Sequence, residues 1–320
     1  MKQTSLGLGA STERTLWREF LDEMEQVVPW ADLVALVAPY LPESKRGRPP
    51  LPVESLLSID FMQQCFTLSD QSKDGALHDV PLFRDFAGLG GWGDRPPDES
   101  TIMRFRPVLE MHKLAPQILA IINDLLRAKC LMLRSGTAVD ATLIAAPSST
   151  KNASREHDQE MHQSKKGQQW YFGMKAHIGV DADSGLVHTV RGTSGHVKDV
   201  IVANSLLHGE ETDAFGEAGY QRANKRPDAK AKVNRHTAMR PGLRKKLDKE
   251  TPLGKLIDQI ERTKAQIRAK AEHPFRVIKR QFGHVKVRYR GLAKNTAQLH
   301  KLFALSNLRM VRRHLLGATA

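Results

Sequence analysis

Three carboxylates in this sequence lie in contexts that favour chemistry over simple solvation. Asp140 lies inside a small, β-branched and apolar segment, Glu217 follows the short stretch 212–216, and Glu272 lies among Lys and Arg residues. Hard cations such as Mg²⁺ prefer oxygen ligands, and two such ions can activate an attacking oxygen and stabilise a leaving one in phosphoryl transfer. The three acids therefore predict a site that holds two Mg²⁺ ions, for which Mn²⁺ is expected to substitute.

Each acid also has an ordinary structural interpretation, and the residues alone leave both open. A carboxylate buried in a strand is costly without a partner, but Asp140 could instead cap the turn that follows its strand. A single Glu among basic residues, such as Glu272, is most often the partner in a salt bridge. The choice between these interpretations depends on whether the three acids meet in space.

The elements that would position these acids are a set of short strands and two helices. β-Branched and apolar residues predict strands over 137–144, 171–180, 186–191 and 212–216, with a Ser184-Gly185 turn between the second and third. Helical periodicity predicts helices over 199–207 and 255–271, so that Glu272 ends a basic helix. Strands followed by helix, strand and long helix predict a mixed α/β domain.

The sequence before residue 131 is typical of a helical domain. Apolar residues at intervals of three and four predict helices over 11–39, 53–67, 70–78, 81–87 and 115–129. A further helix opens at Asp98 and is expected to expose Arg104 and Arg106. Several short helices that end in one with exposed arginines are compatible with a helix-turn-helix-like DNA reader, although any small helical domain has this pattern.

The uneven distribution of charge predicts a polyanionic partner. The net charge is +14, and residues 221–320 hold 27 Lys and Arg against 6 Asp and Glu, while residues 1–220 hold 22 against 29. A basic third joined to a mildly acidic remainder favours nucleic acid. No run of 18 apolar residues or secretory signal is visible, and Cys65 and Cys130 are expected to be reduced, buried thiols in a cytosolic protein.

Other residues that could bind metal or DNA are better explained by packing and turns. His177, His188 and His196 are scattered among the predicted strands and are expected to be packed or surface side chains. Residues 170–172, Trp-Tyr-Phe, are expected to belong to the core, whereas packing and DNA contact are equally compatible with Tyr220. Asp199 is expected to cap the following helix.

Several blocks of the sequence, taken together, resemble the DDE transposases of bacterial insertion sequences. They are closest to the insertion-sequence-five group, within the insertion-sequence-four superfamily. Residues 139–152 resemble the block around the first Asp, 175–188 the next strand pair, and 217–221 the second-acid block, normally Asp-Ala-Gly-Tyr-Gln. Residues 46–50, 79–81 and 97–101 resemble the family's N-terminal helical region. The third-acid block, R-x3-E-x6-K, is matched by Arg268, Glu272 and Lys279.

The resemblance implies a fold, a division into domains and a set of roles. It implies a helical DNA-binding and assembly domain over 1–130 and a ribonuclease-H-like catalytic domain with a basic C-terminal region over 131–320. Mg²⁺ would be held by three catalytic acids, and four basic residues would contact DNA phosphate. The acids are Asp140, Glu217 and Glu272, and the basic residues are Arg268, Arg276, Lys279 and Arg280.

The implied function is cleavage and transfer of double-stranded DNA at the ends of an insertion sequence and into target DNA. The enzyme would act as a homodimer or higher multimer on paired DNA ends. It would work at the nucleoid in the bacterial cytoplasm and would not bind a membrane. A DNA-binding copy that has lost activity is an alternative, and so is a metal-dependent nuclease that does not join strands.

Three positions depart from the family pattern. Glu217 replaces the usual Asp, and an extra methylene moves a carboxylate by about 1 Å, which can cost on the order of 100-fold in rate. Ala265 replaces a signature tyrosine, and Arg222 stands where glycine is expected. These departures predict a weakened or inactive copy as the alternative function, with Asp213 as a possible substitute ligand.

Overall fold

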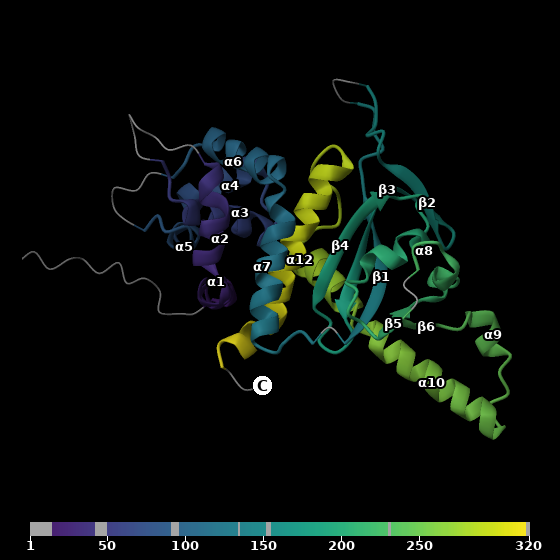
Figure 1. Cartoon of the computed structure of the whole chain (residues 1–320). Coiled ribbons are helices and arrows are strands. Elements are labelled where there is room, and N and C mark those ends of the chain that lie inside the picture. The colour runs from purple at the N-terminus through teal and green to yellow at the C-terminus, as the bar shows by residue number, and fades with distance from the viewer. Residues whose placement is uncertain are drawn as a thin grey trace, which may run out of the picture.

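The computed structural model describes residues 15–41, 50–90, 96–133, 135–151, 155–229 and 232–317. A helical part at the N-terminus is followed by a mixed α/β part, and the two lie side by side (Figure 1). This confirms the mixed α/β class and the helical N-terminal region. Most of the basic segment 46–50, quoted above for its resemblance, lies outside the described residues.

Seven α-helices and one 3₁₀ turn form the described N-terminal part. Side chains that accept a backbone N–H cap three of them: Thr15 for the first, Ser69 for the fourth and Asp98 for the sixth. The elements are α1 (Leu16–Val27), α2 (Trp30–Val37), η1 (Ala38–Tyr40), α3 (Val53–Cys65), α4 (Asp70–Asp79), α5 (Pro81–Phe86), α6 (Glu99–Met111) and α7 (Leu114–Ala128).

Arg106, on α6, does not face solvent as expected. Its guanidinium contacts both carboxylate oxygens of Asp70, at 2.5 and 3.2 Å, and lies 4.5 Å from the ring centre of Tyr289. The expectation of an exposed Arg106 was therefore wrong, because periodicity along one helix does not reveal an acid on another helix. Arg104, on the same helix, is exposed.

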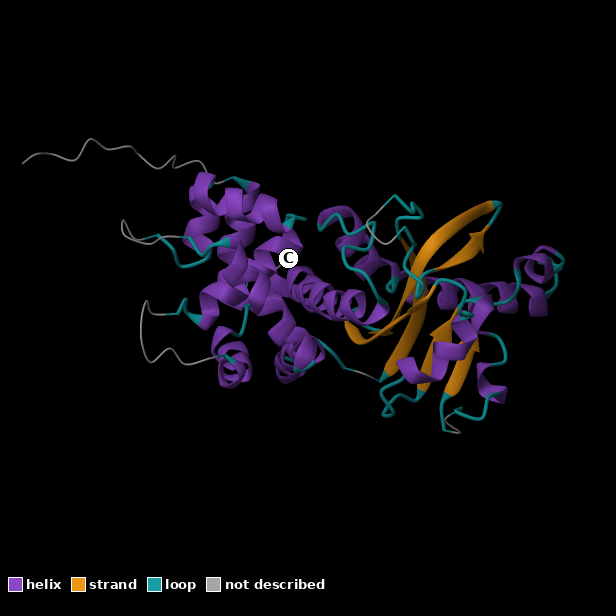
Figure 2. Cartoon of the chain, turned by 90° about the horizontal axis from the view of Figure 1, so that it is seen from above, coloured by secondary structure: helices purple, strands orange, loops and turns teal. Residues whose placement is uncertain are grey.

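Six strands form one mixed sheet. The long strand β3 pairs antiparallel with β1 along one edge and with β2 and β4 along the other, while β5 and β6 extend the sheet parallel to β1. Figure 2 shows this sheet beside the helical part. The strands are β1 (Gly136–Ala145), β2 (His162–Lys166), β3 (Gln169–Asp181), β4 (Val187–Ser194), β5 (Asp213–Gly216) and β6 (Asn234–Thr237).

The helical segments of the C-terminal part flank this sheet, and the longest of them, α12, was not foreseen. They are α8 (Asp199–Val202), η2 (Ala203–Leu206), η3 (Ala218–Tyr220), η4 (Ala223–Lys225), α9 (Pro241–Lys245), α10 (Pro252–Ala269), α11 (Glu272–Arg276), the π-helical turn η5 (Val277–Gln281) and α12 (Leu292–Leu315).

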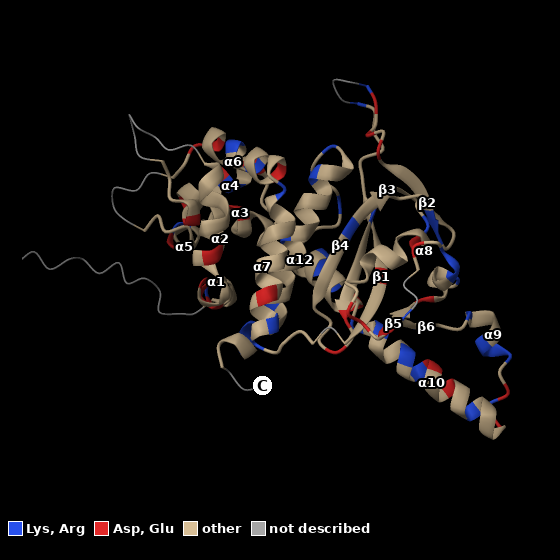
Figure 3. Ribbon diagram, in the orientation of Figure 1, with Lys and Arg blue, Asp and Glu red and all other residues tan. Residues whose placement is uncertain are grey.

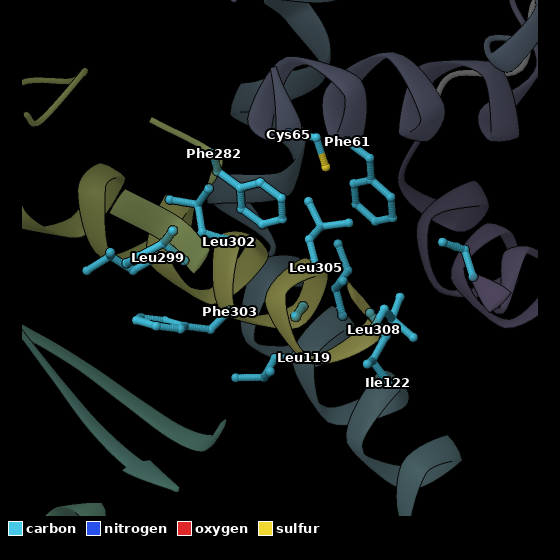
Figure 4. Packing of buried hydrophobic residues seen from close by; sticks show 14 of the residues in the cluster. Phe61, Cys65, Leu119, Ile122, Phe282, Leu299, Leu302, Phe303, Leu305 and Leu308 are labelled. Carbon is cyan, nitrogen blue, oxygen red and sulfur yellow. The ribbon is translucent and has the colours of Figure 1, made fainter. Parts of the chain in front are cut away.

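Helix α12 lies between the sheet and the N-terminal helices. It packs against β4 on one side and against α1, α3 and α7 on the other. Its apolar side chains, including Leu302, Phe303 and Leu305, are almost fully buried and meet Phe61 and Leu119 from the N-terminal helices (Figure 4). A single hydrophobic cluster therefore runs from the helical part into the sheet, with α12 at its centre.

Polar side chains cross the same boundary. Nζ of Lys301, on α12, donates to both carboxylate oxygens of Asp60, on α3, at 2.7 Å, and both side chains are buried. The Gln298 amide donates to Gln64 Oε1 at 2.9 Å. Buried charges are tolerated only when paired, so this contact fixes how α12 sits against α3.

Removal of one member of this pair is expected to destabilise the fold strongly. Asp60→Ala leaves the Lys301 ammonium buried without its counter-charge, which costs about 3–5 kcal/mol. The double variant Asp60→Leu with Lys301→Met replaces both charges by apolar groups. Its free energy of unfolding is expected to lie within about 1 kcal/mol of the wild-type value. Urea unfolding measures both, and equal losses in the two variants would contradict this account of the pair.

Two further expectations about burial were wrong. Trp170 is 62% exposed, because it lies close to the turn between β2 and β3 rather than in the core, although Phe172 does pack against the core. Cys65 is buried but Cys130 is exposed, just after α7 ends. Within the described ranges, no helix is long and apolar enough to cross a membrane.

Candidate catalytic site

Asp140 lies near the middle of β1, on the opposite face from Val139. Val139 packs with Leu206 and Tyr220 in a small apolar cluster on one face of the sheet, and side chains alternate along a strand, so the Asp140 carboxylate points to the other face. Its backbone is paired with Ile178 of β3. The Asp140 side chain is only partly buried, and its Oδ1 accepts the N–H of Ala141 at 2.7 Å.

The strand register brings Glu217 next to Asp140. Val139 is paired with Gly216 across the parallel strands β1 and β5, and Asp140 and Glu217 each follow by one residue. Neighbouring strands lie about 5 Å apart, so the two backbones are adjacent and both side chains leave the sheet on the same face. Two acids separated by 76 residues in the chain therefore share one place in the fold.

Electrostatics link the third acid to the same place. The pKa of Asp140 is raised to about 6; burial is the largest cause, and the charges of Glu217 and Glu272 add to it, against the lowering effects of the Ala141 N–H and of Arg268. The charges of the other two predicted acids therefore both act on Asp140. Mutual repulsion between carboxylates of this kind is relieved by a cation.

Glu272 occupies a different position from the one predicted. It does not end the basic helix; α10 ends at Ala269, and Glu272 is the first residue of the short helix α11. The physical reason is Pro274, which has no N–H to donate to the carbonyl of residue 270 and so interrupts the helical hydrogen bonding. This break turns the chain so that Glu272 begins a new helix.

Arg268, in the last turn of α10, is the counter-charge of the site. Its Nη2 donates to Glu217 Oε1 at 3.0 Å, while its Nε is buried and has no hydrogen-bond partner among the described residues. A guanidinium offers five donors in a rigid fork, so Arg268 has capacity left for a further acceptor. Glu217 itself is 58% exposed on its side chain and can move.

Lys279 supports the strand that carries Asp140. Its Nζ donates to Thr142 Oγ1 at 2.6 Å and to the Leu143 carbonyl at 2.7 Å. Burial, followed by the charge of Lys166, lowers the pKa of Lys279, and the charge of Asp140 opposes this. Thr142 was missed as a site residue, although it lies two residues beyond Asp140 and so on the same face of β1.

The two remaining basic residues lie along the surface that leads away from Glu272. Arg276 and Arg280 are both exposed, and they follow Glu272 at intervals of four residues through α11 and the π-helical turn η5. Residues four apart lie on the same side of a helix. Glu272, Arg276 and Arg280 therefore form an exposed row that begins at the acids.

Two candidates from the sequence lie outside this neighbourhood. Asp213 is four residues before Glu217 on β5, a separation of about 13 Å along a strand, and its carboxylate contacts His236 Nε2 at 2.7 Å, which lowers its pKa. Asp213 is therefore not a substitute ligand. His177 is fully buried, and burial lowers its pKa to about 4, as befits a packed neutral imidazole.

The residues around Glu217 have structural roles. Tyr220 is 4% exposed and its ring lies against Gly216, where an added Cβ would come within 3.2 Å of three ring and side-chain atoms. Arg222 adopts a φ of 70°, the left-handed backbone that favours glycine. Asp199 does not cap its helix, whose N-cap is Lys198; instead it accepts a hydrogen bond from Lys175 Nζ at 2.9 Å.

No ready-made metal cage is present in the described part of the chain, because no three His, Cys, Asp or Glu side chains are arranged closely enough to hold an ion. The chemistry of the donors nevertheless suits a hard divalent cation, since the charges of Glu217 and Glu272 both act on Asp140 and Glu217 is paired with Arg268. Carboxylate sites of this kind, beside basic side chains, are typical of enzymes that act on phosphodiesters.

Comparison with protein families agrees with this class of enzyme. Residues 132–308 match the family described as "Transposase DDE domain", and residues 12–107 match "Transposase domain (DUF772)". The first match alone covers more than half of the chain, so the chain belongs to the transposases with a DDE domain. No solved structure matches the chain.

Proposed function

We propose that this transposase is an Mg²⁺-dependent enzyme in which Asp140, Glu217 and Glu272 hold two metal ions and which cleaves and transfers DNA strands at insertion-sequence ends. The observation that carries the proposal is the combined effect of Glu217 and Glu272 on Asp140, from three separate elements of the fold. Bound at these carboxylates, Mg²⁺ would neutralise charge at the attacking and leaving oxygens of a phosphodiester.

The proposed roles of the protein side chains follow from their contacts. Asp140 is the fixed acid, because its strand is paired on both sides and its carboxylate is held by the Ala141 N–H. Glu217 is the exchangeable acid, which gives up Arg268 when it takes a cation. Arg268, released from Glu217, is then available for a DNA phosphate, which its planar fork suits.

The DNA path of the proposal begins at the acids and follows the exposed row of Arg276 and Arg280. Both guanidinium groups are available to phosphates of double-stranded DNA, whereas two donors of Lys279 are already used within the protein. Lys279 is therefore proposed chiefly to position β1, and its contact with phosphate is limited to its third donor. Figure 3 shows further Lys and Arg residues along α9, α10 and β2.

The proposed catalytic fold is ribonuclease-H-like. Supporting this is the sheet order β4-β3-β1-β5-β6, in which three antiparallel strands are followed by two parallel to β1. The proposal assigns residues 131–320 to this catalytic domain and 1–130 to a DNA-binding and assembly domain. We also propose that the protein belongs to the insertion-sequence-five group. It would act as a homodimer or higher multimer on DNA, at the nucleoid in the cytoplasm.

A second candidate function, a DNA-binding copy with weakened catalysis, is favoured by one specific observation. Glu217 is longer than the Asp that the family uses and is engaged with Arg268. A strand-transfer assay in Mg²⁺, with plasmid as target and a DNA end that carries a free 3′-hydroxyl, separates the possibilities. Joined product that disappears with EDTA supports the transposase. DNA binding without cleavage supports the weakened copy, and cleavage without joining supports a nuclease.

A further inference from the structure

Helix α10 buries charged residues and exposes apolar ones, the opposite of what is expected for a helix that packs only on its own chain. Its inward face carries Asp258 and Glu261, each 5% exposed, while Leu253, Leu256 and Ile260 point outward and are 67%, 54% and 46% exposed. A surface helix normally turns its apolar stripe toward the core. Three large apolar side chains on one exposed helix face therefore require an explanation.

The inward carboxylates hold α10 in this orientation. Asp258 contacts Arg244, Lys249 and Arg262 at 3.0, 3.7 and 2.9 Å. Glu261 accepts the Met239 N–H at 2.9 Å and the Lys264 ammonium at 2.8 Å. Arg262 and Lys264 belong to α10 itself, but Arg244, Lys249 and Met239 lie outside it. Rotation of the helix would break these three contacts, so they oppose burial of its apolar side chains by turning.

The outward residues repeat with the spacing of a coiled coil. Positions 253, 256, 260, 263 and 267 alternate steps of three and four, which places them on one seam of a helix. We call this row, Leu253, Leu256, Ile260, Thr263 and Ile267, the α10 seam. The flanking side chains Gln259 and Gln266 are exposed and uncharged. Figure 1 shows α10 extending away from the sheet, and Leu253, Leu256 and Ile260 of the seam are exposed.

We propose that the α10 seam binds the α10 seam of a second copy of this chain, in antiparallel orientation. Core layers of antiparallel coiled coils pair the two kinds of seam position, which places Leu256 against the second copy's Ile260, and Leu253 against its Thr263. Each contact then occurs twice about a two-fold axis, as an isologous dimer requires. The seam is self-complementary, and it carries no charge that a DNA phosphate would recognise.

Charge favours the antiparallel arrangement. Each chain has a net charge of +14, and α10 joins the body of the protein at its C-terminal end, near Arg268. Parallel pairing would bring the two positive bodies together, whereas antiparallel pairing places them at opposite ends and opposes the helix dipoles. The paired stretch, 13 residues from 252 to 264, is about 20 Å long, so the contact lies at the low end of specific interfaces and is expected to be reversible.

This dimer would connect assembly to the catalytic site. Arg268 lies in the last turn of α10, and Glu272 follows three residues after the helix ends. Pairing of α10 would therefore steady the helix that presents the counter-charge of Glu217. The inference extends the multimer of the proposed function but depends only on α10, so its tests use no DNA and no catalysis.

Disulfide cross-linking tests both the surface and its orientation. The exposed Cys130 is first changed to Ser, and Leu256→Cys and Ile260→Cys are made separately in the full chain. Mild oxidation is expected to cross-link an equal mixture of the two variants at least fivefold more than either variant alone. More cross-linking within each separate variant than in the mixture would overturn the antiparallel pairing, and absence of any cross-link would overturn the seam itself.

Sedimentation provides the second measurement. Wild type is expected to show a dimer that grows with protein concentration, and Ile260→Lys is expected to remain a monomer at the same concentrations. Leu16→Lys, at an exposed apolar position on α1 (82% exposed, against 46% for Ile260), is the control and is expected to dimerise like wild type. If Ile260→Lys dimerises like wild type, the seam is not a self-association surface.

Discussion

Replacement of Asp140 by Asn is expected to abolish metal-dependent cleavage and joining of DNA while making the fold more stable. The activity falls because loss of one anionic ligand weakens a metal centre worth several kcal/mol, which corresponds to on the order of 1,000-fold in rate. The stability rises because burial, together with the charges of Glu217 and Glu272, raises the pKa of the Asp140 carboxyl to about 6. Asn has nearly the same shape and carries no charge.

The gain in stability should depend on pH. A carboxyl whose pKa is higher in the folded than in the unfolded chain penalises folding at high pH, and the penalty fades as the pH falls below 6 and is gone below about 4. The difference between a pKa of 3.8 and one of about 6 corresponds to at most roughly 3 kcal/mol for this partly exposed side chain. Urea unfolding of wild type and Asp140→Asn without metal should therefore show a larger difference at pH 8 than at pH 5. A variant that is less stable at pH 8, or that still joins DNA, would contradict this account.

Glu217→Asp is expected to raise the rate of strand transfer by on the order of 100-fold. The longer side chain displaces the carboxylate by about 1 Å, and positional errors of this size can cost that factor. In the structure Arg268 Nη2 donates to Glu217 Oε1 at 3.0 Å, a contact that a side chain shorter by one methylene is not expected to keep. The shorter acid is expected to release Arg268 for DNA phosphate and to lie closer to Asp140.

The rate with pre-cleaved DNA ends and plasmid target in Mg²⁺ measures this effect, because the first cleavage step is then bypassed. Glu217→Ala is the matched control and should lose activity, which separates the benefit of a better-placed carboxylate from mere removal of the ion pair. A Glu217→Asp variant slower than wild type would mean that the longer acid is the one adapted to this site.

Much of the site could be predicted because it depends on local pattern. The β-branched run around Asp140 predicts a strand, the short apolar stretch before Glu217 predicts another, and parallel pairing of the two aligns the acids. The helices of the N-terminal part could also be predicted, because their apolar residues are periodic and capping residues precede several of them. The family's preference for glycine at position 222 has a physical reason in this structure, since Arg222 adopts the left-handed backbone that favours glycine.

What could not be predicted depends on contacts between distant segments. Arg106 is turned inward by Asp70, and α12 is buried between the sheet and the N-terminal helices although nothing in its own sequence states its neighbours. The position of Glu272 at the start of α11 follows from Pro274, a signal that was available but was outweighed by the helical periodicity before it. The exposure of Trp170 likewise follows from where the β2–β3 turn falls.

The central claim is that Asp140, Glu217 and Glu272 form a single site for divalent metal. Mn²⁺ binding to the full chain without DNA, followed by electron paramagnetic resonance at pH 8, tests it most directly. Wild type is expected to bind Mn²⁺, and Asp140→Asn and Glu272→Gln are each expected to weaken binding by at least tenfold, while Asp213→Asn leaves it unchanged. Equal Mn²⁺ affinity in wild type and Asp140→Asn would contradict the claim.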